Sequence, residues 1–151
     1  MIRRLSQTVA VAAVLLACAL FSCSAQAQQQ SKTRDGVFVH LTHGAENPHR
    51  LLMGLQMAVT MAEGGQDVLV YCDIEAVKAL TTTAKPVTFK PFKSSHELLN
   101  RLKELNVTVL ACPTCMKAAH IEPAALRPGV SVAQKDRLFA FTKGRILSLD
   151  Y

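Results

Sequence analysis

Two cysteines three residues apart, Cys112 and Cys115, are the side chains whose type and spacing best suit chemistry in this sequence. They stand where an apolar run gives way to Pro113. Proline favours the first position of a helix, so Cys112 is expected at a helix start, where unpaired N–H groups and the helix dipole favour negative charge. Because the thiolate is the reactive form of cysteine, the pattern predicts a nucleophilic Cys112 with Cys115 as a second thiol.

Other interpretations of this pair stay open. The two cysteines would also suit a permanent disulfide with no chemical role. They would equally suit a soft metal, zinc or copper, with Cys72 or His120 as a further ligand, since both metals take thiolate and imidazole. Met116 rather than histidine follows Cys115, which excludes covalent haem attachment through a C-x-x-C-H motif.

Two more side chains are candidates for adjusting the charge near the sulfur atoms. Lys117 adds a positive charge two residues after the second cysteine, and His43 is either an acid–base group or a solvated residue of a loop. His40 falls inside a predicted strand and is interpreted as structural. Cys72 is interpreted as a small buried hydrophobe rather than a third reactive thiol.

The elements that must position these residues alternate between strand and helix. Apolar runs without polar alternation predict buried strands over residues 36–41, 67–72 and 107–111, as in a parallel sheet. Capping signals predict helices that begin at Pro48, Ser95 and Pro113, and a short one after Asp73 as the cap. A brief strand is expected at 87–89. The last segment suits either a hairpin or a helix over 132–143 followed by a strand over 145–149, and the alternation favours the helix.

The predicted fold is an α/β domain of three layers with a mainly parallel sheet of about five strands. Sites in such sheets form beyond the carboxyl ends of the strands. The predicted strands end at His43, Cys72 and Cys112, so these side chains meet if their strands are neighbours.

The N-terminus has the three parts of a secretory signal peptide over residues 1–27: a basic start, an apolar run and small residues before the cleavage point. The apolar run is shorter than the ~20 residues that span a bilayer. We expect an exported, periplasmic protein, with a polar, flexible tether over 28–35 and one domain over 36–151. Cys18 and Cys23 lie in loose lipoprotein-like boxes, so a lipid anchor is the alternative to soluble release.

Composition narrows the classes of function. Loss of Arg3 and Arg4 with the leader lowers the formal net charge from +6 by two, to +4, which is mild. The chain has no tryptophan and no basic stripe interleaved with aromatic residues, so nucleic-acid binding is not expected. Three cysteines remain beyond residue 27, and an odd number leaves at least one thiol outside any intramolecular disulfide.

The chain resembles the DsrE/DsrF-like family in three segments: GVFVHLTHG (36–44), QMAVTMAEGGQDVLVY (56–71) and VTVLACPTCMKAAHI (107–121). The resemblance covers roughly residues 36–151 and implies the flavodoxin-like or Rossmann-like architecture of that family. In its sulfur-relay members the cysteine of the last segment accepts a persulfide and passes it on, and Cys112 matches that position. Cys115 is an addition, and His120 stands where relay members tend to have glycine.

The resemblance implies a role in sulfur or thiol-redox handling. Cys112 would be the persulfide-carrying nucleophile, and Cys115 would resolve the persulfide into a disulfide with release of sulfide. It also implies a homo-oligomer, a trimer or hexamer. We expect its partners to be a sulfur donor and acceptor or a thiol-redox protein. No cofactor is expected. A carrier that never turns over a free substrate would have the same sequence, so catalysis is left open.

Overall fold

The computed structural model describes residues 33–151. The predicted signal peptide over 1–27 and most of the predicted tether over 28–35 lie outside the described residues. Within the described part, no helix combines the length and the apolar character that crossing a membrane requires.

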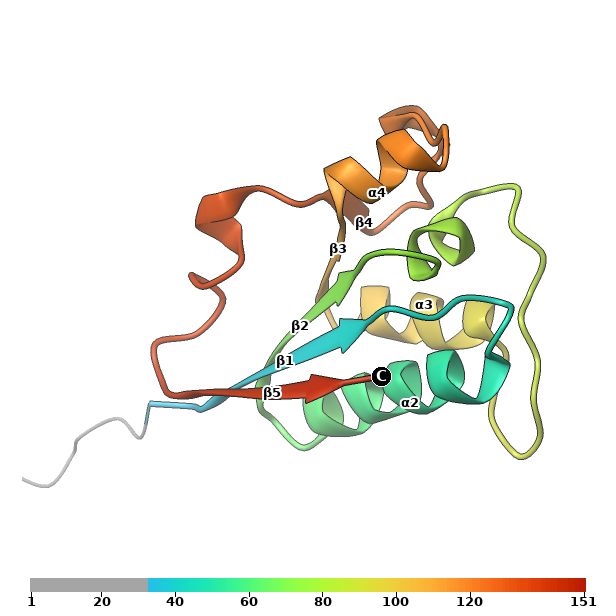
Figure 1. Cartoon of the computed structure of the whole chain (residues 1–151). Coiled ribbons are helices and arrows are strands. Elements are labelled where there is room, and N and C mark those ends of the chain that lie inside the picture. The colour runs from blue at the N-terminus through green and yellow to red at the C-terminus, as the bar shows by residue number, and fades with distance from the viewer. Residues whose placement is uncertain (1–32) are drawn as a thin grey trace, which may run out of the picture. The chain divides into compact units, whose positions relative to one another are not determined.

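A five-stranded parallel sheet forms the centre of the domain (Figure 1). Every pair of neighbouring strands is parallel, which confirms the predicted α/β class with a mainly parallel sheet. The order across the sheet is β4-β3-β2-β1-β5. The strands are β1 (Gly36–Leu41), β2 (Asp67–Cys72), β3 (Thr108–Ala111), β4 (Val130–Val132) and β5 (Ile146–Asp150).

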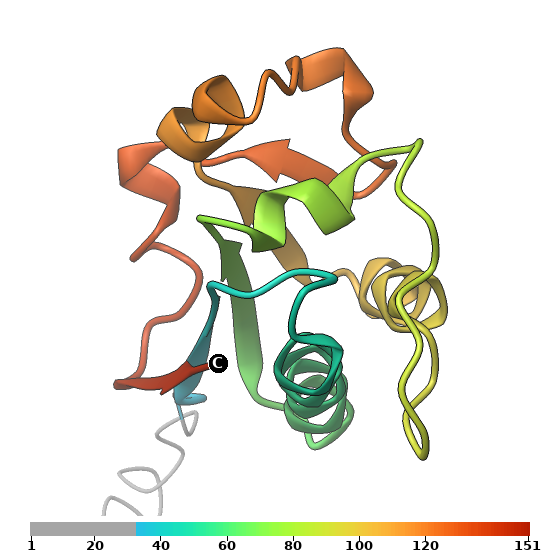
Figure 2. The same ribbon diagram turned by 45° about the vertical axis from the view of Figure 1, so that its right-hand side comes forward.

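Two helices, α2 (Pro48–Glu63) and α3 (Ser95–Glu104), pack side by side on one face of the sheet (Figures 1 and 2). Asn47 caps α2, since its side chain accepts a hydrogen bond from the Arg50 N–H. Ser94 and Glu97 form a reciprocal capping box at the start of α3. These local signals place both helices where the sequence predicts them.

Two short helices lie at the end of the sheet where β2 and β3 finish (Figure 2). One is α4 (Pro113–Ala118), which begins at the predicted proline. The other is the 3-10 helix η2 (Ala76–Leu80), in place of the predicted helix capped by Asp73. Asp73 does not cap it, because its side chain is bonded elsewhere, as described below.

The predicted helix over 132–143 is wrong. The chain there leaves β4, forms the short 3-10 helix η4 (Lys135–Arg137) and continues without regular structure to β5. Residues 134–137 are polar and interrupt the apolar stripe that a helix packed on the sheet would need. This connection runs along the side of the sheet away from α2 and α3 (Figures 1 and 2).

The brief strand expected near 87–89 is also absent. Val87 is buried, but its backbone N–H donates to the Ser95 hydroxyl at 3.0 Å and its carbonyl accepts from the Ser95 N–H at 2.9 Å. The start of α3 therefore satisfies the backbone groups that a neighbouring strand would otherwise have to pair.

Candidate functional site

The carboxyl ends of β1, β2 and β3 lie side by side, which meets the condition under which the predicted site residues converge. Backbone hydrogen bonds extend the sheet just past these ends. The Cys112 N–H donates to the Cys72 carbonyl at 2.9 Å, and the Asp73 N–H donates to the Leu41 carbonyl at 3.0 Å. The hydrogen-bond pattern of the sheet thus continues to the residues directly after the strands.

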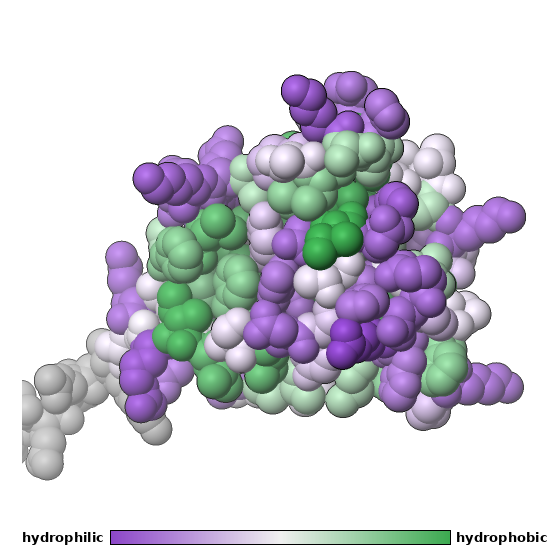
Figure 3. Space-filling model, in the orientation of Figure 1, coloured by the Kyte–Doolittle hydropathy of each residue, from purple (hydrophilic) through white to green (hydrophobic). Residues whose placement is uncertain are grey.

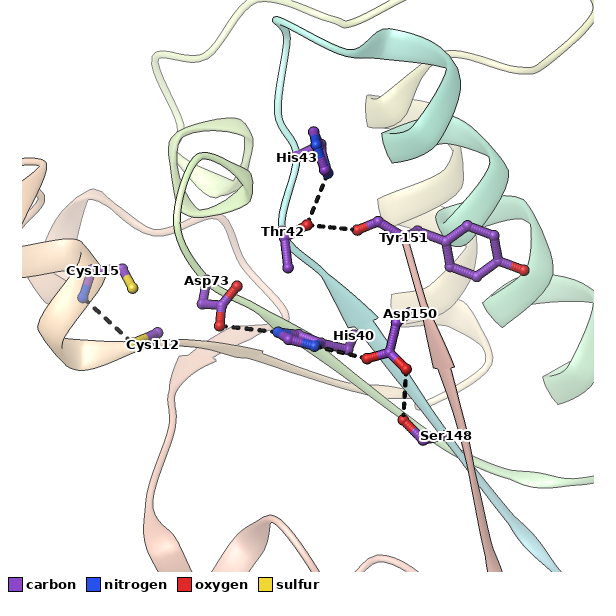
Figure 4. Close-up of polar contacts among 9 residues, drawn as sticks. All are labelled: His40, Thr42, His43, Asp73, Cys112, Cys115, Ser148, Asp150 and Tyr151. Carbon is purple, nitrogen blue, oxygen red and sulfur yellow. Dashed lines mark hydrogen bonds and ion pairs between the residues drawn. The ribbon is translucent and has the colours of Figure 1, made fainter.

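Cys112 is the N-cap residue of α4, as its position before Pro113 predicts. Its sulfur accepts a hydrogen bond from the Cys115 N–H at 3.4 Å, so the two cysteines share the first turn (Figure 4). The residue is 9% exposed. The nucleophile candidate therefore lies just under the surface, beside the second thiol.

The surroundings push the pKa values of the two thiols apart. Burial alone would raise the pKa of Cys112, but hydrogen bonds from the Tyr71 hydroxyl, the Cys115 thiol and the backbone N–H groups of the first turn outweigh it and hold that pKa below its usual value. Burial, together with the hydrogen bond to Cys112, raises the pKa of Cys115. Cys112 is thereby favoured as the thiolate nucleophile, and Cys115 as the second thiol, which stays protonated until it reacts.

Tyr71, which the sequence analysis did not single out, supplies the side-chain hydroxyl that bonds Cys112. It lies opposite His40 in the register of β1 and β2, with the two rings 5.6 Å apart, and stacks on Phe38 at 6.1 Å. Burial raises the pKa of the Tyr71 hydroxyl well above its usual value, so the group remains a proton donor.

Replacing Tyr71 with phenylalanine is expected to slow the reaction of Cys112 with iodoacetamide at neutral pH by about fivefold or more. The variant removes a hydrogen bond to a charged group, worth about 1.5–3 kcal/mol before solvent exposure weakens it. The rate is measured by quenching the alkylation at successive times and following the modified Cys112 by mass spectrometry. Tyr151→Phe is the matched control, because that ring lies away from both cysteines (Figure 4). Equal rates in the wild type and Tyr71→Phe would contradict this role.

His40 bridges two carboxylates, Asp73 directly after β2 and Asp150 on β5 (Figure 4). Its Nε2 lies 2.9 Å from Asp73 Oδ2, and its Nδ1 lies 2.9 Å from Asp150 Oδ1. Burial lowers the pKa of this imidazole, but the hydrogen bonds and charges of both carboxylates outweigh the effect and raise it overall. The interpretation of His40 as structural therefore misses a charged row that crosses β2, β1 and β5.

Asp73 joins this row to the cysteines, since it lies between them and His40 (Figure 4). Its Oδ2 is bonded to His40, while its Oδ1 is buried and has no hydrogen-bond partner among residues 33–151. Its charge also contributes to the raised pKa of Cys115. The sequence contains only a weak signal for this role, an acidic residue directly after a buried strand.

A sequence model of the DsrE/DsrF-like family matches residues 35–144. The chain belongs to the DsrE/DsrF-like family. This confirms the resemblance seen in the sequence and supports a function of the sulfur-relay type at the level of the family.

Two solved structures share the fold of this DsrE/DsrF-like domain. The YchN protein from E. coli is 21% identical, with a TM-score of 0.60 over 78% of this chain and 99% of its own. The protein of unknown function MTH1491 from Methanobacterium thermoautotrophicum is 16% identical, with a TM-score of 0.53 over 77% of this chain and 99% of its own. No curated protein matches the sequence.

The other predicted site residues of this DsrE/DsrF-like chain form none of the hydrogen bonds that the structure shows at the two sulfur atoms. His43 bonds the Thr42 hydroxyl at 2.8 Å, has the Arg50 guanidinium 3.4 Å away and lies away from both cysteines (Figure 4). Lys117 and His120 line an open pocket of ≈ 330 Å³ beside α4. Tyr71 and Asp73 are the side chains outside the cysteine pair that act on the pKa values of these thiols.

The third thiol, Cys72, is completely buried at the end of β2. Burial raises the pKa of this thiol far above its usual value, which suits the predicted role as a small core residue. All three cysteines of residues 33–151 are free thiols. Within that same range, no three His, Cys, Asp or Glu side chains are grouped so that they could hold a metal ion.

Proposed function

We propose that this protein is a periplasmic carrier of sulfane sulfur, with Cys112 as the nucleophile that takes up the sulfur and Cys115 as the thiol that resolves it. The observation that carries the proposal is the pair of thiols within one helical turn whose pKa values are shifted in opposite directions. Membership of the DsrE/DsrF-like family supports the same chemistry at a coarser level.

Uptake begins when the Cys112 thiolate attacks the terminal sulfur of a persulfide or polysulfide donor. A new bond forms between Cys112 Sγ and that sulfur, while the S–S bond of the donor breaks and the donor leaves as a thiolate. Hydrogen bonds from Tyr71 and the first turn of α4 stabilise the attacking thiolate. Cys112 then carries a persulfide that an acceptor thiol can take over.

Resolution follows when the sulfur of Cys115 attacks Cys112 Sγ. The Cys112–Cys115 disulfide forms, the S–S bond of the persulfide breaks, and hydrosulfide leaves with the electron pair. The two cysteines are oxidised by two electrons and the sulfane sulfur is reduced to sulfide. A dithiol protein of the same compartment must then reduce the disulfide, which makes a thiol-redox protein a second partner.

The location in the periplasm rests on the signal-peptide pattern of residues 1–27. Soluble release after cleavage is the proposed form, with a lipid on Cys18 or Cys23 as the alternative. The intact mass of the protein recovered from the periplasmic fraction distinguishes a cleaved chain, a lipidated chain and an uncleaved one.

We also propose a homo-oligomer, a trimer or hexamer, as the family implies. Apolar side chains gather on the side where β5 begins and the connection from β4 runs (Figure 3). Phe139, Ile146 and Leu147 are exposed there, as interface residues would be in an isolated protomer. Light scattering in solution gives the mass of the assembly, and the mass of one protomer would contradict this part of the proposal.

Exposure of the reduced mature protein to polysulfide is expected to add one or more sulfur atoms to Cys112, and Cys112→Ser is expected to add none. Serine lacks the thiolate that attacks the donor, so the loss should be complete. Intact mass and peptide mapping locate the added sulfur. A wild-type protein that forms a stable disulfide and takes up no sulfur would favour the inert-disulfide alternative. Zinc or copper retained after dialysis and lost in Cys112→Ser would favour the soft-metal alternative.

A further inference from the structure

We propose that Asp73 is the proton acceptor for the Cys115 thiol, and that His40, bridged to Asp150, holds the Asp73 carboxylate in place for that task. The inference rests on the proposed function, because it concerns the step in which Cys115 resolves a sulfur adduct of Cys112. It adds a polar row of Asp73, His40 and Asp150 to the two thiols at the junction of β3 and α4.

The backbone around Asp73 brings this residue to Cys115. The N–H of the next residue, Ile74, lies close enough to the Cys115 sulfur to act on that thiol and lower its pKa. Ile74 has a φ of +46°, a left-handed conformation that is unfavourable for a β-branched side chain. Strain of this kind persists where surrounding contacts impose it, and it is concentrated at functional sites. The N–H groups on either side, of Asp73 and Glu75, donate to the carbonyls of Leu41 and Thr42 at 3.0 and 3.1 Å and hold the turn to the end of β1.

One oxygen of the Asp73 carboxylate is hydrogen-bonded, and the other has no hydrogen-bond partner among residues 33–151. Oδ2 is 2.9 Å from His40 Nε2, whereas Oδ1 is buried without a hydrogen-bond partner among the described residues. A buried oxygen of a carboxylate that lacks a donor costs free energy, and native proteins contain few such atoms. If Oδ1 accepts the proton that the Cys115 thiol must lose during the reaction, this unpaired oxygen has a function.

The resolving step needs such a group. Cys115 is mainly protonated because its pKa is raised, yet only the thiolate attacks a disulfide or persulfide sulfur. Its titratable neighbours are Cys112, Asp73 and Tyr71, and Asp73 in turn faces His40. Cys112 is occupied by the sulfur adduct at this step, and the Tyr71 hydroxyl is a donor, which leaves Asp73 to accept.

The resolving step moves one proton and exchanges one S–S bond for another. The Cys115 proton passes to Asp73 Oδ1 as the Cys115 sulfur bonds to Cys112 Sγ. The bond from Cys112 Sγ to the outgoing sulfur breaks, and that sulfur leaves with the electron pair. His40 keeps Oδ2 occupied throughout, so that Oδ1 is the oxygen presented for the proton. Asp150, whose side chain is 66% exposed, anchors the other side of the imidazole.

The reaction of the reduced protein with dithionitrobenzoate tests this step without any sulfane sulfur. The first thionitrobenzoate is released when Cys112 attacks the reagent, and the second when Cys115 resolves the mixed disulfide. In the wild type the rate of the second phase should change little between about pH 6 and pH 8. A thiol ionised by solvent alone would gain about tenfold in rate per pH unit.

Asp73→Asn is expected to slow the second phase at neutral pH by about tenfold or more and to give it that tenfold rise per pH unit, since general bases contribute about 10²–10⁴-fold. Asparagine keeps an oxygen for His40 but cannot accept the proton. Asp67→Asn, the same change at the other end of β2, is the matched control and should behave like the wild type.

Two results would overturn the inference: a wild-type second phase that rises tenfold per pH unit, or an Asp73→Asn rate equal to the wild type. The first needs no variant, so the test stands even if Asp73→Asn does not fold. A protein that shows the expected second phase but takes up no sulfur from polysulfide would contradict the proposed function and leave the role of Asp73 intact.

Discussion

Cys115→Ser is expected to keep the sulfur that it takes up and to release sulfide at least about a hundredfold more slowly than the wild type. In the wild type the attacking sulfur is in the same helical turn as Cys112, and such intramolecular reactions have effective concentrations of about 10⁵ M or more. Serine at position 115 leaves only external thiols to do this work. A sulfide-trapping assay gives the rate, and intact mass shows the persulfide that accumulates on Cys112.

Cys72→Ala is the matched control for this experiment. It removes a thiol that is completely buried in the sheet and has no part in the proposed chemistry. Uptake and release of sulfur should therefore follow the wild type. If Cys72→Ala loses sulfur uptake while it remains folded, or if Cys115→Ser releases sulfide at the wild-type rate, the division of roles between the three thiols is wrong.

Leu52→Ala is expected to lower the free energy of unfolding by about 2–5 kcal/mol, a large part of the 5–15 kcal/mol of a typical domain. Leu52 is 0% exposed on the face of α2 that packs on the sheet, so the variant leaves a cavity behind β1 and β2. These strands carry His40, Tyr71 and the turn with Asp73. Urea denaturation measures the change.

The neighbouring residue on α2 provides the comparison. Met53 is 36% exposed, and Met53→Ala should cost no more than about 0.5 kcal/mol. A cost for Met53→Ala as large as that for Leu52→Ala would mean that α2 presents a different face to the sheet.

Local signals in the sequence determined the first six regular elements, from β1 to α4 with the exception of the short turn η2. Asn47 with Pro48 and Ser94 with Glu97 are complete capping signals, and their hydrogen bonds form within a few residues of the chain. The position of Cys112 as the N-cap of α4 likewise follows from Pro113 next to it. Interactions of this range are readable without knowledge of the fold.

The secondary structure of the later part of the chain is decided by neighbouring strands, which local sequence patterns do not reveal. Val130–Val132 forms β4 because β3 pairs with it, in the register Val109↔Val130. Val132, which was predicted to begin a helix, lies instead in this strand at the edge of the sheet. Short apolar segments suit either structure, and the neighbouring strand decides between them.

The chain itself determined the thiol pair and its place at a strand-to-helix junction, whereas the tertiary structure decided what surrounds that pair. His40 and Asp150 are 110 residues apart and meet only because β5 pairs in parallel with β1, in the register His40↔Asp150. Tyr71 and Asp73 gain their roles because β2 lies between β1 and β3. Spacing along the chain reveals contacts within one element, but strand order and register, which arise from the packing of the whole domain, bring distant side chains together.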